Sequence, residues 1–337
     1  MRFLICGLGS IGRRHLRNLR GLGQQDIVLC RTGLGTLPDD DLAGIPVEPD
    51  LATALERWQP DAAVVANPTA LHLEAAIPAA RAGCHVFIEK PVSDRLDGVE
   101  DLRAALAAGG GQVLVGFQYR FNPGLIRARE LLQSGVIGQP LSARAHWGEY
   151  LPDWHPWEDY RVSYAARADL GGGAALTLCH PFDYLRWLLG EVDSVQGATR
   201  HSQALGLEVE ELAEATLELQ SSCLASVHLD YHQRPAQHWL AIQGSEGSLR
   251  WDGGSGDLQW WSASDKLWHD EPAAAGYERN TMFLEEMIHF LAVVRGDVQP
   301  RCTLEDGVRA LEIALAVRQS AKDGHRIEIA SVERSAV

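Results

Sequence analysis

Lys90 has the side chain and the setting that proton transfer needs. It follows an apolar run at residues 85–88 and precedes Pro91, a residue type that restricts the backbone of its predecessor. If this setting removes water from the ammonium group, the pKa of Lys90 falls toward the range in which an amine exchanges a proton near neutral pH. The alternative is a surface lysine that forms an ion pair with Glu89.

His180 is the second residue suited to acid–base chemistry. Pro181 fits only the first turn of a helix, so a helix is expected to begin at His180 and to end before Gly190. Asp183 and Tyr184, three and four residues further on, then share a face with His180. The alternative is a buried structural histidine, the commoner role of a lone histidine.

A glycine-rich turn opens the chain and gives this chemistry a cofactor. Gly7, Gly9 and Gly12 follow an apolar run at residues 3–6 and precede a helix expected at residues 12–22. This spacing is typical of the turn that binds the pyrophosphate of a dinucleotide, whose charge the helix N-terminus stabilises. A purely structural glycine turn is the alternative. The residues expected around the pyrophosphate are Gly7, Gly9, Ser10, Ile11, Gly12 and Arg13.

The end of the second apolar run bears on which dinucleotide is bound. An acidic residue is expected there when the ligand is NAD, because it accepts hydrogen bonds from the adenosine ribose. This chain has Arg31 and Thr32 instead, and a cation with a hydroxyl group suits the 2′-phosphate of NADP. The residues therefore favour NADP over NAD, with two alternatives: Arg31 is simply solvated, or residues 39–41 supply the acid.

The first 120 residues predict an α/β fold. Continuously apolar runs alternate with helical segments, a pattern typical of a doubly wound parallel sheet covered on both faces. In such sheets ligands bind beyond the carboxyl ends of the strands. Five polar or glycine residues are expected at those ends and therefore close together: Gly7, Arg31, Asn67, Lys90 and Gln118.

The second half of the chain predicts a different domain. Segments rich in β-branched and aromatic residues suit a sheet with one buried face; they lie at residues 141–147, 194–200, 214–219, 223–232, 239–244 and 248–251. Two helices are expected at residues 281–294 and 304–323, and the last is expected to pack back on the first domain.

An aromatic segment at residues 150–161 is expected to form one wall of a substrate site. Aromatic rings stack on sugar rings, and charged or hydroxyl groups bind sugar hydroxyls. An aromatic cluster that plugs the edge of the sheet is an equally good interpretation. The residues chosen from this segment are Tyr150, Trp154, His155 and Tyr160.

Composition narrows the class of protein. The net charge of −15 argues against a nucleic-acid partner. No apolar run reaches the length of a membrane span, and no export signal is expected at the N-terminus. The six cysteines lack the spacing of metal ligands, so free thiols in a reducing, cytoplasmic compartment and no metal site are expected.

These motifs together resemble the glucose–fructose oxidoreductase / inositol dehydrogenase / rhizopine-catabolism (Gfo/Idh/MocA) oxidoreductases. The resemblance rests on five segments of this chain: residues 7–12, residues 67–72, Glu89-Lys90-Pro91, residues 117–123, and the glycine triplet at residues 171–173 followed by His180 and Asp183. It implies a Rossmann domain, followed by an α+β domain with a large, mostly antiparallel open sheet. It also implies NAD(P)-dependent hydride transfer at a carbon of a sugar, cyclitol or nucleotide sugar.

The resemblance also assigns further residues and favours acid–base roles for Lys90 and His180. To the cofactor it assigns Asn67, Pro68, His72, Glu89, Lys90 and Gln118. To a small, sugar-like substrate it assigns Lys90, Arg120, Asn122, Thr177, His180 and Asp183, beside the four aromatic-segment residues. The implied domains are residues 1–120 for the dinucleotide and 121–337 for substrate and oligomerisation, as a homodimer or homotetramer.

One position departs from the family pattern. Many members carry an aspartate four residues before the histidine, where this chain has Leu176. An active enzyme remains the preferred interpretation, because Lys90 and His180 are both present. The alternatives are a catalytically silent NAD(P)-binding sensor or assembly subunit, and a reductase of imines or unsaturated bonds on the same fold.

Overall fold

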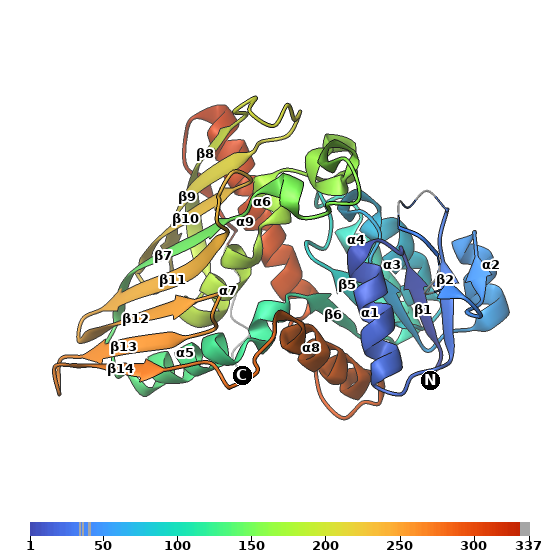
Figure 1. Ribbon diagram of the computed structural model, residues 1–337, viewed down its shortest axis with the longest axis horizontal. Helices are drawn as coiled ribbons and strands as arrows, with labels where there is room; N and C mark the ends of the chain where they lie inside the picture. Colours follow the sequence, from blue (N-terminus) through green and yellow to red (C-terminus); the bar gives the residue numbers. More distant parts are fainter. Residues whose placement is uncertain (34, 36, 40–41, 331–337) are drawn as a thin grey trace. The chain divides into compact units, whose positions relative to one another are not determined.

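The computed structural model describes residues 1–33, 35, 37–39 and 42–330 (Figure 1). Its contacts divide the chain into two compact units, which are described separately. Unit 1 contains Met1–Phe121, His155–Gly172 and Glu278–Leu311, and unit 2 contains Asn122–Trp154, Gly173–Tyr277 and Glu312–Val337. Residues 155–172 and 278–311 thus belong to unit 1. The assignment of residues 1–120 to the dinucleotide and of residues 121–337 to the substrate stays a prediction.

Unit 1 is built on a parallel sheet of six strands in the order β3-β2-β1-β4-β5-β6. All four residues of β1 and of β4 are buried, as expected for strands covered on both faces. This confirms the predicted doubly wound α/β fold. The strands are β1 (Phe3–Cys6), β2 (Ile27–Cys30), β3 (Val47–Glu48), β4 (Ala62–Val65), β5 (His85–Glu89) and β6 (Val113–Gly116).

Two helices of unit 1 occur within two residues of the ranges predicted at residues 12–22 and 281–294. Helix α3 contains Pro78. The α-helices are α1 (Ser10–Gly21), α2 (Leu51–Trp58), α3 (His72–Arg81), α4 (Val99–Gly109) and α8 (Arg279–Val294). Short 3-10 turns follow β4, follow β6 and fill the 155–172 segment: η2 (Thr69–Leu71), η3 (Gln118–Phe121), η5 (Tyr160–Val162), η6 (Tyr164–Ala166) and η7 (Ala168–Leu170).

Unit 2 contains a sheet of nine strands in the order β14-β13-β12-β11-β7-β10-β9-β8-β15. Among the described strands of this sheet, only β7 and β10 pair in parallel, so the predicted mostly antiparallel sheet is confirmed. The strands are β7 (Pro140–Gly148), β8 (Val192–Arg200), β9 (Leu212–Leu219), β10 (Leu224–Asp230), β11 (Gln237–Gly244), β12 (Gly247–Asp252), β13 (Leu258–Ser262), β14 (Leu267–Glu271) and β15 (Ile327–Glu328).

Helices cover one face of this sheet and leave the other open. Buried and exposed residues alternate along β9, which is the pattern of a half-buried strand. The helical elements of unit 2 are α5 (Pro123–Ser134), η4 (Leu151–Asp153), α6 (Ala174–Thr177), α7 (His180–Leu189) and the second half of α9 (Leu304–Asp323). Helix α5 and the strands β13 and β14 were not predicted.

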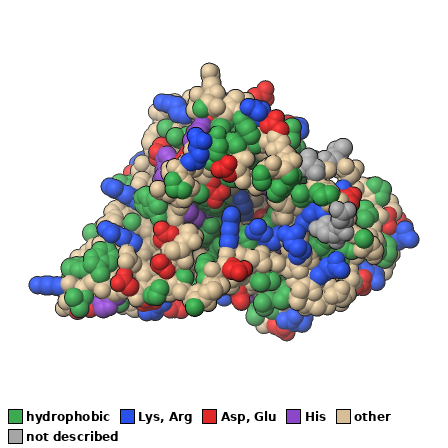
Figure 2. All heavy atoms as spheres, in the orientation of Figure 1, with side chains coloured by type: hydrophobic (Ala, Val, Ile, Leu, Met, Phe, Trp, Pro, Cys, Tyr) green, Lys and Arg blue, Asp and Glu red, His purple; other side chains and the backbone are tan. Residues whose placement is uncertain are grey.

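On the face drawn in Figure 2, acidic, basic and hydrophobic side chains are interspersed. Among the described residues, no helix has the length and the apolar character that crossing a membrane requires. All six cysteines are free.

Candidate active site

The glycine turn has the backbone geometry that its spacing predicts. Gly7 has a φ of +91°, and a Cβ there would lie 2.5 Å from the backbone nitrogen of Asn67. A Cβ on Gly12 would lie 2.0 Å from the carbonyl oxygen of Gly7. Gly9, in contrast, has nothing within 4 Å of the place a Cβ would take. The turn is therefore closed on its inner side and open at Gly9, where a ligand's phosphates can approach.

Helix α1 presents an uncapped N-terminus to this open side. Among the described residues, no side chain caps this N-terminus by a hydrogen bond, and no acidic residue lies in the first turn. Its partial positive charge is therefore not neutralised locally, as an anion site requires. Ser10, the first helical residue, contacts His155, whose Nε2 lies 3.1 Å from the Ser10 Oγ.

The carboxyl ends of the strands bring the predicted cofactor residues to one edge of the sheet. The parallel registers join β2 to β1, β1 to β4, β4 to β5 and β5 to β6. Along the edge therefore lie, in spatial order, Arg31, Gly7, Asn67, Lys90 and Gln118. The structure thus produces the arrangement that the strand order predicted.

At the end of β2, Arg31 already has an acidic partner. Its guanidinium forms an ion pair with Asp39, whose carboxylate also accepts a hydrogen bond of 3.2 Å from Arg13. The Arg31 hydrogen bond, followed by the charges of both arginines, lowers the pKa of Asp39. Arg31, Thr32 and Asp39 border an open pocket of about 490 Å³. Asp39 is therefore a candidate for the acidic residue that an NAD site would require. Asp40 and Asp41 lie outside the described residues.

Arg13 and Pro68 have contacts that were not anticipated. Arg13 is buried, and its Nε donates to the carbonyl oxygen of Leu8 at 3.1 Å, so it ties the glycine turn to the Asp39 loop. Pro68 precedes η2, and its carbonyl oxygen accepts a hydrogen bond from the amide of Leu71. Both residues shape the edge of the sheet.

Asn67 and His72 connect the end of β4 to the end of β5. Asn67 donates from Nδ2 to the carbonyl oxygen of Leu71 at 2.9 Å, and its buried Oδ1 has no hydrogen-bond partner. The two ring nitrogens of His72 lie 2.8 Å from the Pro91 carbonyl oxygen and 3.0 Å from that of Asn67. Burial, partly opposed by these carbonyl groups, lowers the pKa of His72. Asn67 therefore keeps one acceptor available at the ligand edge.

Beneath Lys90 lies a buried histidine–carboxylate pair. His15 Nε2 donates to Glu89 Oε1 at 2.7 Å, and the other oxygen of Glu89 accepts the backbone N–H of Lys90 at 3.2 Å. Burial opposes ionisation of Glu89, but the His15 hydrogen bond and nearby charges nevertheless keep its pKa low. The Lys90–Pro91 peptide bond is cis, and Lys90 is half-buried.

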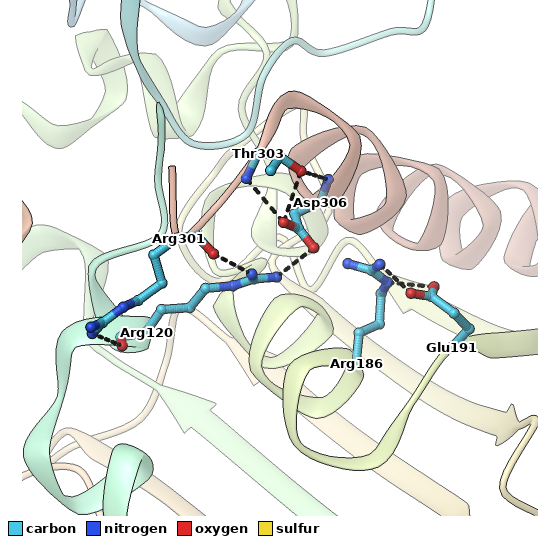
Figure 3. Close-up of polar contacts among 6 residues, drawn as sticks. All are labelled: Arg120, Arg186, Glu191, Arg301, Thr303 and Asp306. Carbon is cyan, nitrogen blue, oxygen red and sulfur yellow. Dashed lines mark hydrogen bonds and ion pairs between the residues drawn. The ribbon is translucent and has the colours of Figure 1, made fainter. Parts of the chain in front are cut away.

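Three residues assigned around the end of β6 have structural partners. Gln118 is buried in η3. Arg120 donates to the carbonyl oxygen of Arg301 at 2.9 Å and forms a 3.0 Å ion pair with Asp306 (Figure 3). Asn122 accepts the Leu125 amide as the N-cap of α5 and donates to the Tyr277 hydroxyl at 2.8 Å. These contacts support anchoring roles for Arg120 and Asn122, and their predicted contact with substrate stays a prediction.

The aromatic segment is divided between the two units. In unit 1, His155 Nδ1 lies 2.9 Å from Glu158, and Arg161 stacks over the Tyr160 ring. In unit 2, Arg234 lies 3.9 Å above the Tyr150 ring, and Trp154 meets Tyr231 edge-on. His155 was predicted to touch substrate, but within its unit it contacts the phosphate turn through Ser10.

In unit 2, His180 begins α7 as predicted and lies in an aromatic stack. Its ring is 5.1 Å from the Trp147 ring, and His238 stacks on the same tryptophan at 4.4 Å. His180, Asp183, Thr177 and Leu176 are all buried. Leu176 thus fills its position with an apolar side chain where a family member's aspartate would place a carboxylate.

The glycine triplet explains a residue that the sequence did not single out. A Cβ on Gly173 would lie 2.5 Å from both carboxylate oxygens of Glu210. Glu210 accepts a 3.2 Å hydrogen bond from the Ala175 amide and forms a 2.7 Å ion pair with Arg318. Gly173 therefore makes room for the carboxylate that holds the start of α6, the helix containing Leu176 and Thr177.

A second unpredicted cluster lies on the open face of the unit 2 sheet. The rings of His146 and His228 are stacked 4.6 Å apart, and His228 Nε2 donates to Asp230 at 2.9 Å. The Asp230 hydrogen bond, aided by Glu214, raises the pKa of His228 to about 9. A nitrogen ligand binds a metal in the plane of its ring, so parallel rings do not direct both donors to one ion. His146 Nε2 is buried and has no hydrogen-bond partner among the described residues.

Comparison with known proteins matches the chain in two consecutive parts. Residues 1–117 match the model of the oxidoreductase family NAD-binding Rossmann fold, and residues 129–329 match the C-terminal alpha/beta domain of the same family. A 1,5-anhydro-D-fructose reductase from Ensifer adhaerens is 30% identical over 285 residues, which is 80% of each chain. Myo-inositol 2-dehydrogenase from Thermotoga maritima is 26% identical and covers 98% of this chain and 99% of its own.

Solved structures show the same fold. Levoglucosan dehydrogenase in complex with NADH and levoglucosan matches with a TM-score of 0.85 at 20% identity, covering 98% of this chain and 100% of that one. The glycine turn, the strand-end lysine and the two matched domains all agree with the resemblance found in the sequence. The chain belongs to the Gfo/Idh/MocA family of NAD-binding oxidoreductases.

Proposed function

We propose that this protein transfers a hydride between a nicotinamide cofactor and a carbon of a sugar or cyclitol, with Lys90 and His180 handling the proton. The single observation that supports this most strongly is the edge of the unit 1 sheet. There the open, uncapped phosphate turn and Lys90 follow strands of one parallel sheet. The cofactor supplies hydride chemistry when it is bound, and the protein supplies orientation and acid–base groups.

The residues present fit such a cofactor. Gly9 leaves space for the phosphates, the first turn of α1 offers its amides, and Asn67 Oδ1 is a buried acceptor without a partner. Lys90 and His180 would hold or move the proton of the substrate hydroxyl group. Proton transfer of this kind contributes roughly 10²–10⁴-fold to a rate.

The substrate class is supported by the relatives. Their printed activities concern 1,5-anhydro-D-fructose and myo-inositol, and a structural neighbour binds levoglucosan. The test is a panel of these three compounds, other sugars and nucleotide sugars, with reduced-cofactor absorbance as the signal. Full turnover by a Lys90→Met variant on any substrate found would refute the proposed mechanism.

For the cofactor we propose NADP(H) in preference to NAD(H), on the basis of Arg31 and Thr32. Asp39 is the opposing feature, because its carboxylate already neutralises Arg31 and could itself accept hydrogen bonds from a ribose. Titration of the protein with NADPH and NADH decides between them. Asp39→Asn should strengthen NADPH binding relative to NADH, and a clear preference of the native protein for NADH would overturn the argument from Arg31.

Leu176 favours a second candidate, a cofactor-binding protein that does not catalyse. It buries an apolar side chain where many relatives carry an acid. Tight NAD(P)H binding without turnover across the substrate panel would support this candidate. Reduction of an imine or unsaturated bond is a further possibility, and the same panel extended to those compounds tests it.

We also propose a homodimer or homotetramer that works in the cytoplasm on a small molecule, without nucleic acid. The family resemblance and the open face of the unit 2 sheet support self-association, and the six free thiols support a reducing compartment. Light scattering coupled to size-exclusion chromatography measures the assembly directly.

A further inference from the structure

The buried pair beneath Lys90 has a task that the proposed function leaves unassigned. Glu89 is the last residue of β5, 6% exposed, and its two oxygens face His15 and the backbone N–H of Lys90. His15 comes from α1 and is fully buried. Glu89 therefore joins helix α1, which follows the phosphate turn, to the backbone of Lys90.

The hydrogen bonds of His15 and Glu89 show which of the two side chains is the donor. A carboxylate can only accept, so the proton between His15 and Glu89 resides on His15 Nε2. His15 Nδ1 is buried without a partner, beside the ring of Phe87 at 4.8 Å. A second proton on Nδ1 would bury an unsatisfied N–H, which is costly. His15 therefore donates to Glu89 from Nε2, and the two oxygens of Glu89 accept from His15 and from the backbone N–H of Lys90.

Charged groups on several elements bear on Glu89. His72, on α3, has its pKa lowered, first by burial, and so is neutral near pH 7. Arg14, on α1, stacks its guanidinium 4.4 Å over the ring of Phe283, and its charge also interacts with Glu89. Glu286, on α8, is a further acid among the buried residues of that helix. Lys90 follows Glu89 directly in the chain, and its ammonium charge helps to lower the pKa of Glu89.

We propose that His15 and Glu89 are positioning residues that keep Lys90 in its ammonium form, so that Lys90 acts as the proton donor to the substrate oxygen. This inference rests on the proposed role of Lys90. The sequence predicted that loss of water would lower the pKa of Lys90, with an ion pair to Glu89 at the surface as the alternative. A buried anion acts in the opposite direction from loss of water.

The step balances as follows. In reduction of a carbonyl group, hydride from the reduced nicotinamide forms the new C–H bond, and the Lys90 Nζ–H bond breaks as its proton forms the new O–H bond. The products are an alcohol, the oxidised cofactor and a neutral Lys90 amine, which then takes a proton from water. Oxidation of the alcohol runs through the same positions in reverse.

The small number of lysines allows a test without any substrate. The chain has only three, Lys90, Lys266 and Lys322, and the last two are exposed. Acetic anhydride reacts with amines and not with ammonium groups, so labelling across a pH series followed by mass spectrometry gives each lysine's titration midpoint. Lys266 and Lys322 serve as internal references in every sample.

Removing the buried charge is the decisive change. With Glu89→Gln, the midpoint of Lys90 should fall by roughly one pH unit or more, which is at least a tenfold gain in labelling where the native lysine is still protonated. Asp97→Asn, which removes an exposed acid of the same unit, should leave that midpoint unchanged. An unchanged midpoint in Glu89→Gln would overturn the proposal.

The role of His15 is tested by a pair of variants. Gln places an N–H near the position of Nε2, so His15→Gln should retain the native midpoint, whereas His15→Leu should lower it in the direction of Glu89→Gln. Equal midpoints for His15→Leu and the native protein would remove His15 from the proposal. If His15→Leu does not fold, as judged by circular dichroism, the Glu89→Gln and His15→Gln results decide.

The two proposals fail in different ways. If Lys90→Met retains turnover, the proposed function loses its acid–base residue whatever the labelling shows. If Lys90→Met is inactive but the labelling midpoints do not respond to Glu89→Gln, the proposed function stands and only this inference is lost. NADPH and NADH titration of each variant shows that the cofactor site is intact.

Discussion

The strand-end edge of unit 1 and the open sheet face of unit 2 both contain clustered polar side chains. The two clusters differ in how many of their polar groups have hydrogen-bond partners. At the edge, Asn67 Oδ1 has no partner, the N-terminus of α1 has no cap and Gly9 borders empty space. On the face, both ring nitrogens of His228 are bonded to carboxylates. The edge therefore has groups left for a ligand, whereas both nitrogens of His228 are already bonded within the chain; in its cluster, His146 Nε2 is the buried nitrogen without a partner among the described residues.

The largest effect should come from Lys90, the titratable group of the edge. Lys90→Met removes the proposed proton donor, so we expect turnover to fall roughly 10²–10⁴-fold. Steady-state kinetics on a substrate found in the panel measures the loss. Lys266→Met, at an exposed site in unit 2, is the matched control and should be fully active.

Substitutions of Gly12 and Gly9 should differ, because Gly12 lies on the closed inner side of the glycine turn and Gly9 lies on its open side. A Cβ on Gly12 would overlap the Gly7 carbonyl oxygen, so Gly12→Ala should cost roughly 1–3 kcal/mol of unfolding free energy as well as cofactor affinity. Gly9→Ala should fold normally and bind the cofactor more weakly, because its methyl group points into open space. Urea unfolding and NADPH titration give both quantities, and equal stabilities of the two variants would contradict this assignment.

On the open face, the effect should appear in stability and depend on pH. His228 has its pKa raised from 6.5 to about 9, so its contribution is complete below pH 6.5 and is lost as the pH rises through 9. The shift sets an upper bound of about 3 kcal/mol, which screening on a partly exposed sheet reduces to roughly 1–2 kcal/mol.

Unfolding of the native protein and of His228→Asn between pH 6 and pH 10 measures this contribution. The native protein should be the more stable of the two at pH 6, and the difference should vanish near pH 10. Turnover of His228→Asn should equal that of the native protein if the cluster is structural. A loss of activity without loss of stability would break the comparison between the two regions.

The smallest effect should come from His155, which contacts the phosphate turn without belonging to it. His155→Ala removes its hydrogen bond to Ser10, and we expect cofactor affinity to fall a few-fold, about 1 kcal/mol or less. Titration with ADP-ribose, which keeps the pyrophosphate and lacks nicotinamide, should show the same loss. An effect on substrate KM with no effect on ADP-ribose would restore the original assignment of His155 to the substrate.

The sequence by itself determined those parts of the protein that depend on interactions between residues close together in the chain. Apolar runs, glycine spacing and Pro181 predicted the parallel sheet, the phosphate turn and the start of α7 at His180, because backbone preference and burial pattern act over a few neighbouring residues. The order of the strand-end residues followed from the topology of such sheets. The same reasoning predicted α9 at residues 304–323.

Only the tertiary structure decided which polar groups meet. Strands β13 and β14 depend on pairing, such as Trp261 opposite Trp268, rather than on a local pattern. The pairs Arg31–Asp39 and His15–Glu89 join residues 8 and 74 positions apart, and the contact of His155 with Ser10 spans 145 positions. Hydrogen bonds and ion pairs form between neighbours in space, so the sequence named most of these residues but could not state what each one touches.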